Sequence, residues 1–361
     1  MKTNRLLLFL ALALLTLTLS ACGGVPTATT WPGLAADENA AYLANGSIVY
    51  AVRLSDGEQL WSFPEKPGVK LIFYANPVLT SDGQLLIGSS GSDHSLFLVD
   101  AETGKSDWFF NGARDQWVAS PLVVGNMVYA PNADGNLYIL DLSIPGDDKL
   151  TGTVQLEGRL WGQPTTDDNL IFVTSLDHKV FAVDPQKKSV AWSLELDGAV
   201  AGSALVADGK LYVGSFGATL QAIDIATHKI AWTASTQSWI WGGPILAGET
   251  LYVGDLDGNF YSINTADGKP VADPAKPDGA ILASPILVNG KLIFVTESGA
   301  VYSIEPGGNN PLSLEKLDAK LYTAPVTAGD LILVAPFQSE TSLLVALDKD
   351  GKQVWSFFPQ K

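Results

Sequence analysis

Few residues of this chain are arranged in a way that could support catalysis. The three histidines are His94, His178 and His228. His94 and His178 each follow an aspartate, where a related segment carries Asp134-Gly135, so both are expected in tight hairpin turns. His228 stands where a related segment has Gly104. Because histidines in the turns of separate units are not expected to converge on one ion, no metal site is predicted.

An acidic run that begins at Asp255 invites a calcium interpretation. A calcium loop of the helix–loop–helix type would need Gly at its sixth position and Glu at its twelfth, and the chain has Phe260 and Ala266 there. The run is therefore predicted to be a hairpin turn. No serine lies in a recognisable nucleophile context with a histidine and an aspartate. These patterns predict no catalytic residue and no cofactor.

The amino terminus carries a secretion signal. Lys2 and Arg5 precede an apolar run of 14 residues from Leu6 to Leu19, which is too short to span a bilayer as a helix. The small residues before Cys22 match a bacterial lipobox, in which the cysteine becomes the lipidated first residue of the mature protein. An ordinary signal peptide that leaves an unmodified thiol is the alternative. We predict a signal peptide at residues 1–21 and a lipid-anchored linker at 22–30, which places the protein outside the cytoplasmic membrane, in the periplasm or at an outer membrane if the host has one.

The chain is strongly acidic. It has 22 Lys and Arg against 38 Asp and Glu, and cleavage before Cys22 removes two of the cations, so the mature net charge is −18. Such a surface repels nucleic acid and anionic lipid headgroups. Nucleic-acid binding is therefore not expected, and membrane attachment is expected to depend on the acyl chains. A single cysteine also excludes an internal disulfide.

A repeat of 40 to 45 residues runs through the chain after residue 30. Each unit begins near a proline, continues through an apolar strand, a turn and a second apolar strand, and ends in a polar turn and a last strand. The anchor positions are Pro32, Pro77, Pro121, Pro164, Ala204, Pro244, Pro285 and Pro325. Nine Asp-Gly and three Asn-Gly pairs supply residues suited to tight hairpins. The middle strands are continuously apolar, so both of their faces should be covered. Eight four-stranded antiparallel blades in a ring, an all-β propeller over residues 31–361, satisfy this requirement.

The segment from Asp100 to Trp108 resembles the D-x-x-T-G-x-x-x-W element of pyrroloquinoline-quinone-type propeller repeats. The resemblance implies that the tryptophan stacks between blades and that its indole N–H is bonded by a neighbouring blade. The blade-docking tryptophans are then Trp61, Trp108, Trp192, Trp232 and Trp355. Units 3, 6 and 7 lack this tryptophan near Val154, Ala272 and Leu312, so those blades are expected to dock less rigidly.

Aromatic residues also alternate along the repeats. The residue three before each anchor position is Tyr74, Val118, Trp161, Ala201, Trp241, Leu282 and Tyr322 in units 2 to 8. This position enters the innermost strand, which lines the channel of a propeller. One interpretation is that large and small groups alternate to fill a narrow channel mouth. The other is an aromatic platform for a partner loop, formed by Tyr74, Trp161, Trp241 and Tyr322 with help from Trp117 and Trp239.

The whole mature chain is similar to the BamB-like family of bacterial lipoproteins, whose members are subunits of the outer-membrane barrel-assembly machine. The resemblance implies a non-enzymatic, monomeric scaffold that binds an envelope protein. Two alternatives stay open: a quinone-dependent oxidoreductase and a propeller that binds a glycan through its aromatic residues. Quinone enzymes of this fold commonly use a vicinal cysteine pair and long insertions, and this chain has one cysteine and near-minimal units.

Closure of the ring has two possible forms. The last unit contains its own fourth strand near Trp355, and the first unit begins at Pro32, so blades 1 and 8 could join through side chains alone. Alternatively, residues 25–30 could add an edge strand to the last blade. The sequence does not decide between these arrangements.

Overall fold

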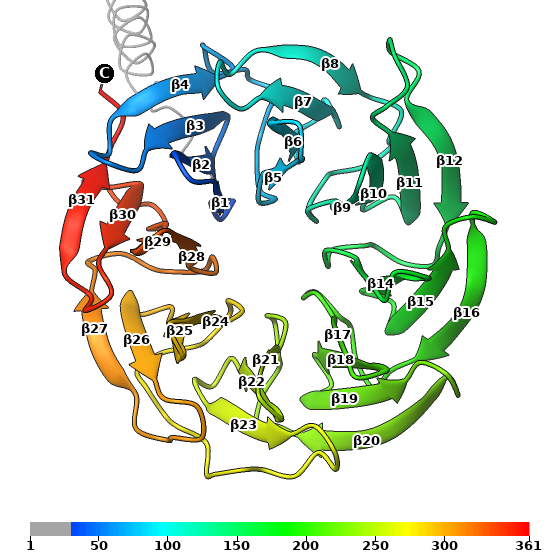
Figure 1. Cartoon of the computed structure of the whole chain (residues 1–361), viewed down its shortest axis with the longest axis vertical. Coiled ribbons are helices and arrows are strands. Elements are labelled where there is room, and N and C mark those ends of the chain that lie inside the picture. The colour runs from blue at the N-terminus through cyan, green and yellow to red at the C-terminus, as the bar shows by residue number, and fades with distance from the viewer. Residues whose placement is uncertain (1–29, 361) are drawn as a thin grey trace, which may run out of the picture.

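The computed structural model describes residues 30–360, and none of them is helical. Thirty-one strands form eight antiparallel sheets arranged as blades around a central axis (Figure 1). This confirms the predicted eight-bladed all-β propeller. No helix within the described residues is long and apolar enough to cross a membrane. The predicted signal peptide, Cys22 and nearly all of the predicted linker lie outside the described residues.

Each blade is one continuous stretch of chain whose strands pair in sequence order, from the channel outward. Blades 1 to 4 consist of β1 (Gly33–Ala36), β2 (Ala40–Asn45), β3 (Ile48–Arg53) and β4 (Gln59–Phe63); β5 (Val78–Leu79), β6 (Gln84–Gly88), β7 (Leu96–Asp100) and β8 (Ser106–Phe110); β9 (Leu122–Val124), β10 (Met127–Pro131), β11 (Asn136–Asp141) and β12 (Leu150–Gln155); and β13 (Thr165–Thr166), β14 (Ile171–Ser175), β15 (Lys179–Asp184) and β16 (Ser189–Glu195).

The second half of the ring repeats this arrangement. Blades 5 to 8 consist of β17 (Leu205–Ala207), β18 (Lys210–Ser215), β19 (Thr219–Asp224) and β20 (Lys229–Ser235); β21 (Ile245–Ala247), β22 (Thr250–Gly254) and β23 (Phe260–Asn264); β24 (Ile286–Val288), β25 (Lys291–Val295), β26 (Ala300–Ile304) and β27 (Leu312–Lys316); and β28 (Val326–Ala328), β29 (Leu331–Val334), β30 (Leu344–Leu347) and β31 (Gln353–Phe357).

The fourth segment of blade 6 does not form a regular strand. It follows β23 and pairs with it through two isolated bridges, Phe260 with Ala275 and Ile263 with Pro270. Pro270 and Pro274 have no backbone N–H, so neither can donate to a ladder. The segment still covers the outer edge of β23, because Val271 N–H donates to Ser262 O at 2.8 Å.

The hydrophobic core lies between the blades. Eight clusters of buried side chains each combine residues of two neighbouring blades. The middle strands supply most of these residues, and β14, for example, is buried along its whole length. A continuously apolar strand has no face that can be left in water, so each blade needs a neighbour on both sides.

Four of the five predicted docking tryptophans donate their indole N–H to a backbone carbonyl of the next blade. The distances are 2.9 Å from Trp61 to Ala101, 2.9 Å from Trp108 to Asp147, 2.9 Å from Trp232 to Thr265 and 2.7 Å from Trp355 to Leu54. Three of these rings pack against a turn glycine of the next blade. At Gly57, Gly104 and Gly268, an added Cβ would come within 3.0 Å of the indole. The glycine therefore supplies both a positive φ and the room for the ring.

The fifth docking tryptophan uses a different contact. Trp192 packs against blade 5, where the turn residue is His228 with a φ of 58°. The imidazole stacks on the indole at 4.8 Å between ring centroids. Trp192 Nε1 is buried and has no hydrogen-bond partner. His228 therefore has a packing role in a hairpin turn, and His94 and His178 also lie in turns with positive φ.

Two interfaces without a tryptophan are filled by other side chains. Between blades 3 and 4, the methylene chain of Lys188 lies over Gly152, and its Nζ donates to Thr151 O at 2.5 Å. Between blades 7 and 8, the turn glycine Gly351 lies over Leu314. The residue of blade 7 that packs against this turn glycine is Leu314, two positions after Leu312, and it is the residue skipped at the bulge in β27.

Within residues 30–360, blades 1 and 8 join through side chains. Their sheets are β1–β4 and β28–β31, and they lie side by side in Figure 1. Trp355 donates to Leu54 O across the junction, and Thr323 Oγ1 donates to Pro32 O. The described residues show these side-chain contacts, and the alternative edge strand at residues 25–30 lies almost entirely outside them.

Replacing Trp355 tests how much this junction stabilises the ring. We expect Trp355→Ala to lower the free energy of unfolding by about 3–5 kcal/mol, since it removes a buried indole, and Trp355→Phe to cost less because it keeps a ring. Val354→Ala, which alters an exposed neighbour on the same strand, is the control and should have little effect. Urea unfolding gives all three values. Equal stability of Trp355→Ala and the control would show that the junction is not maintained by this side chain.

Candidate functional site

The innermost strands of all eight blades begin on one face of the propeller, which we call the entry face. The connections between blades and the turns between second and third strands also lie on this face. The predicted channel-mouth aromatics Tyr74, Trp161, Trp241 and Tyr322 come from the connections that lead into β5, β13, β21 and β28. All four line one central cavity, together with Val118, Ala201 and Leu282 of the odd blades. The sequence pattern therefore predicted which residues meet at the axis.

Trp31 closes the mouth of this cavity. Its ring stacks on Tyr322 at 4.6 Å between centroids and with 18° between planes. It also contacts Trp241 at 5.2 Å and Tyr74 at 6.0 Å. Trp31 was not among the predicted site residues. The signal was present, since Trp31 directly precedes the first anchor proline, where the other units have small or polar residues.

The remaining aromatics extend the cluster away from Trp31. Trp161 lies 6.5 Å from Trp241 between ring centroids, and its indole Nε1 is buried without a hydrogen-bond partner. Burial raises the pKa of Tyr74 to about 12, so its hydroxyl stays protonated at any physiological pH. The even-blade aromatics thus pack around a tryptophan of the chain itself, which favours the channel-filling interpretation of their alternation.

Hydrogen bonds from polar side chains link the innermost segments of neighbouring blades beside these rings. Leu34 N–H donates to Asn76 Oδ1 at 3.0 Å, Ser120 Oγ donates to Asn76 O at 3.0 Å, and Gln163 Nε2 donates to Pro121 O at 3.0 Å. On the other side, Gly243 N–H donates to Ser284 Oγ at 2.8 Å. The cavity that they line measures about 170 Å³, which is smaller than the roughly 300–1,000 Å³ of a typical small-molecule site.

Trp117 does not belong to an exposed platform, so this part of the prediction is wrong. Its side chain is only 1% exposed. It packs against Phe110 and Tyr138, and its indole N–H donates to His94 O at 2.9 Å. The corresponding residue in other connections is also buried, as at Leu160. The position precedes the channel residue and points into the core between blades.

Trp239 is the exposed aromatic of the predicted set. Its side chain is 52% exposed and stacks on Phe216 at 5.2 Å with 13° between planes. Phe216 in turn lies 5.2 Å from Trp241. Phe216 comes from the turn between β18 and β19, and it was missed because one aromatic in a turn gives no periodic signal. The Trp239–Phe216 stack is therefore a rigid aromatic surface that continues into the channel-mouth cluster.

The acidic turn after β22 is a closed hydrogen-bond network. Asp255 is fully buried and accepts from the backbone N–H of Asp257 at 3.0 Å and of Asn259 at 2.8 Å. Its other oxygen accepts from Tyr261 Oη at 2.8 Å. These donors occupy the carboxylate, as the hairpin-turn prediction requires. Within residues 30–360, no group of three or more His, Cys, Asp or Glu is placed to hold a metal ion.

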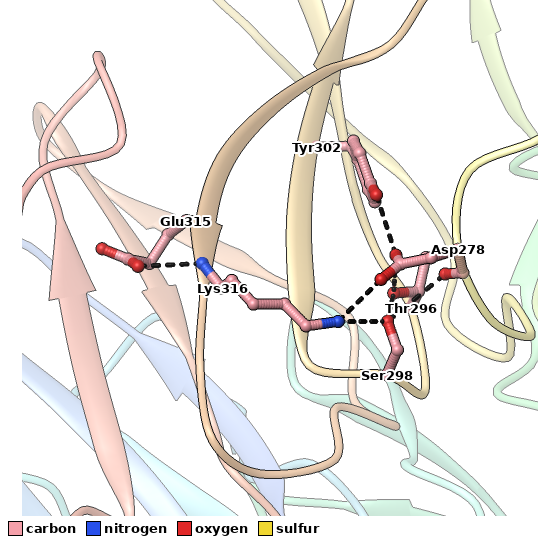
Figure 2. Close-up of polar contacts among 6 residues, drawn as sticks. All are labelled: Asp278, Thr296, Ser298, Tyr302, Glu315 and Lys316. Carbon is pink, nitrogen blue, oxygen red and sulfur yellow. Dashed lines mark hydrogen bonds and ion pairs between the residues drawn. The ribbon is translucent and has the colours of Figure 1, made fainter.

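A second polar cluster at the rim of blade 7 places a serine beside a lysine (Figure 2). Lys316 Nζ lies 2.8 Å from Ser298 Oγ and 2.7 Å from Asp278 Oδ2. Tyr302 Oη donates to Asp278 Oδ1 at 2.8 Å, and Thr296 Oγ1 completes the cluster. A Ser–Lys pair could act in nucleophilic catalysis only if the lysine were neutral. Lys316 forms an ion pair with Asp278, so the cluster joins the blade 6 connection to blade 7.

The electrostatics of this cluster favour the ionised carboxylate. Burial pushes the pKa of Asp278 upward, but the hydrogen bonds from Lys316, Tyr302 and Ser298, together with the charge of Lys316, outweigh it and lower the pKa from 3.8 to about 2. Since the folded-state pKa lies below the unfolded value, the stabilisation is complete above the unfolded pKa and is lost as the pH falls towards the folded one.

Asp278→Asn tests this assignment. Near neutral pH, we expect the variant to be less stable than the wild type by about 0.5–1 kcal/mol, as for other partly exposed ion pairs. The difference should shrink as the pH falls from 3.8 to about 2, because the wild-type carboxylate then becomes neutral as well. Chemical unfolding at a series of pH values gives the difference. A gap that persists unchanged at the acid end would contradict an electrostatic origin.

Trp31→Ala tests the closure of the channel mouth. The substitution removes three ring contacts of about 0.5–1.5 kcal/mol each, so we expect a loss of about 2 kcal/mol in stability. Trp31→Phe should restore part of it, because a smaller ring can still stack on Tyr322. Thermal unfolding of the three proteins measures the effect. Unchanged stability of Trp31→Ala would mean that the contacts at the channel mouth contribute nothing.

Comparison with known proteins gives a consistent result. A family model described as outer membrane protein assembly factor BamB matches residues 44–144 and 145–356. The crystal structure of BamB from Moraxella catarrhalis is similar with a TM-score of 0.69 and 15% identity, over 88% of this chain and 95% of that chain. The computationally designed Ika8 protein is similar with a TM-score of 0.72 and 15% identity, over 92% and 98% of the two chains. At this identity the likeness concerns the fold alone. No curated protein sequence matches the chain.

The repeats, the docking tryptophans and the eight-bladed ring agree with these family matches, which extend over most of the sequence. The chain therefore belongs to the BamB family of propeller proteins with pyrroloquinoline-quinone-type repeats.

Proposed function

We propose that this chain is a non-enzymatic scaffold of the bacterial cell envelope, anchored by lipid at Cys22, that binds a protein partner in outer-membrane protein assembly. The observation that carries the proposal is the packed channel. Trp31 and the even-blade aromatics fill the axis and leave a cavity of about 170 Å³. The interior of the ring is thus occupied by the protein's own side chains. The proposed partner therefore binds at the loops.

The Trp239–Phe216 stack is the proposed centre of the partner contact. Rigid aromatic side chains with large exposed area are typical anchors of protein interfaces. The ring of Phe216 stacks on the indole of Trp239 and supports it. Trp241 supports this surface, because it contacts Phe216 and packs in turn against Trp31 and Trp161.

The proposed location follows from the amino-terminal sequence. The apolar run and the small residues before Cys22 fit export and lipidation. With a mature net charge of −18, the body of the protein gains little from anionic headgroups, so the acyl chains are the principal anchor. The partner is accordingly a protein of the same compartment, and the propeller is proposed to act as a monomer.

The enzymatic alternative has a direct test in the purified protein. A quinone oxidoreductase would bind pyrroloquinoline quinone in the presence of Ca²⁺ with a stoichiometric change in absorbance. We expect none, because the described residues contain no acidic or histidine cluster suited to the cation and the cavity is small. Stoichiometric binding would overturn the scaffold proposal.

Chemical crosslinking in native membranes, followed by purification of the lipidated protein, tests partner binding. We expect Trp239→Ala to lower recovery of the crosslinked partner by tenfold or more, since a central interface aromatic contributes about 2 kcal/mol or more. Phe109→Ala is the matched control, because Phe109 is 55% exposed but lies on the outer strand β8. The control should retain the partner.

Both variants should still unfold in one cooperative transition, with a similar small loss of about 0.5–1.5 kcal/mol because each removes one ring contact. This separates loss of binding from loss of fold. Equal recovery of the partner by Trp239→Ala and by the wild type would show that the aromatic stack is not the contact surface.

A further inference from the structure

Among the blades that end in a regular fourth strand, the connection to the next blade is longest between β4 and β5. It runs over 14 residues, from 64 to 77, whereas the connections that lead into β13, β17, β21 and β28 have nine residues each. All of these connections lie on the entry face. The extra length is not used for pairing with another strand, apart from a single bridge position at Phe73. The β4–β5 loop therefore extends beyond the repeat pattern.

The tip of this loop combines apolar and cationic side chains. Val69 is fully exposed, and Pro67 beside it is exposed as well. Lys66 and Lys70 flank them, and neither forms an ion pair within the part of the chain that the structure describes. Together with the exposed Glu65, these lysines give the tip a net charge of +1, whereas the mature chain has a net charge of −18.

The base of the loop is fixed to blades 1 and 2. Phe73 is fully buried, and its N–H donates to Gly46 O at 2.7 Å. Ser90 N–H donates to Ile72 O at 2.6 Å. The backbone of Lys70 also packs against Gly91, where an added Cβ would overlap Lys70 O. The tip of the β4–β5 loop therefore extends from a base that is fixed by these contacts.

The amino-terminal segment meets the propeller at the same base. Thr30 Oγ1 donates to Phe73 O at 3.4 Å. Eight residue steps separate Cys22 from Thr30, and a fully extended chain spans at most about 3.6 Å per step, or roughly 29 Å in all. A lipid on Cys22 therefore keeps the bilayer surface within that distance of the loop base.

We propose that the tip of the β4–β5 loop contacts the bilayer into which the acyl chains of Cys22 insert. This inference rests on the lipid anchor of the proposed function. Val69 and Pro67 enter the boundary between headgroups and acyl chains, and the ammonium groups of Lys66 and Lys70 bind lipid phosphates. Short apolar segments flanked by lysine suit this boundary, because the long lysine side chains keep their charges at the headgroup level.

This contact leaves the proposed partner surface free. In Figure 1, the connection from β4 to β5 and the connection from β20 to β21 lie on opposite sides of the ring. Trp239 belongs to the latter. With the β4–β5 side held at the membrane, the Trp239–Phe216 stack is turned towards the aqueous compartment. The two contacts then act together, one orienting the propeller and the other capturing the partner.

A single engineered thiol tests the membrane contact. In the lipidated protein the thiol of Cys22 is consumed, so Val69→Cys provides the one free thiol of the mature chain for an environment-sensitive fluorophore. In vesicles of phosphatidylethanolamine with a minority of phosphatidylglycerol, we expect a blue shift of the emission and quenching by spin-labelled lipids. Adding Lys66→Glu and Lys70→Glu should lower the membrane-embedded fraction roughly fivefold for each lysine.

Val124→Cys is the matched control, since Val124 is an exposed valine at the end of β9, on the face opposite to the entry face. Its label should emit as in water. Identical emission of the two labels would overturn the loop contact. So would a blue shift at position 69 that requires a partner protein, because the loop would then be a protein interface.

Mass spectrometry of the purified protein distinguishes failure of this inference from failure of the proposed function. A chain without acyl groups at Cys22 would overturn the lipid anchor and the loop contact together. A lipidated chain whose label at position 69 stays in water would overturn the loop contact alone.

Discussion

The structure depends on the burial of both faces of every blade against its neighbours. Each of the eight hydrophobic clusters is formed by two neighbouring blades, so no blade has a complete hydrophobic core of its own. An open row of such blades would leave two apolar faces in water. Closure of the ring removes them, and Trp355 and Thr323 form side-chain hydrogen bonds across the junction between blades 1 and 8. The eight shared clusters therefore stabilise the propeller as one cooperative unit.

The same interface geometry is filled by different chemistry around the ring. Tryptophan over glycine, with the indole N–H on a carbonyl, is the commonest solution. At other junctions His228 stacks on Trp192, the methylene chain of Lys188 covers Gly152, or Leu314 lies below Gly351. At these junctions, side-chain atoms of one blade pack against, or are supplied by, an outer turn residue of positive φ in the next blade. The hydrogen bond adds stability where it forms, and Trp192 shows that packing can be retained without it.

The two faces of the propeller differ in their loops. On the entry face the connections between blades have variable length and carry the aromatic stack of Trp239, the cluster around Asp278 and the long β4–β5 loop. The opposite face consists mainly of short turns. Trp31 links these features, because it fills the axis and fixes where the amino-terminal segment leaves the ring. The packed channel and the exposed loops thus form one continuous arrangement.

The sequence by itself determined the blade number, the strand order and the residues that meet at the axis. These follow from local patterns: a repeat of constant length, turn residues that accept positive φ, such as His94 and His178, and apolar strands that need cover on both faces. Only the tertiary structure decided that Trp31 fills the channel, that Trp117 is buried and that Asp278 pairs with Lys316 across 38 positions. Such contacts arise where unrelated loops converge, and their geometry depends on loop length and side-chain direction. No periodicity along the chain encodes either of these quantities.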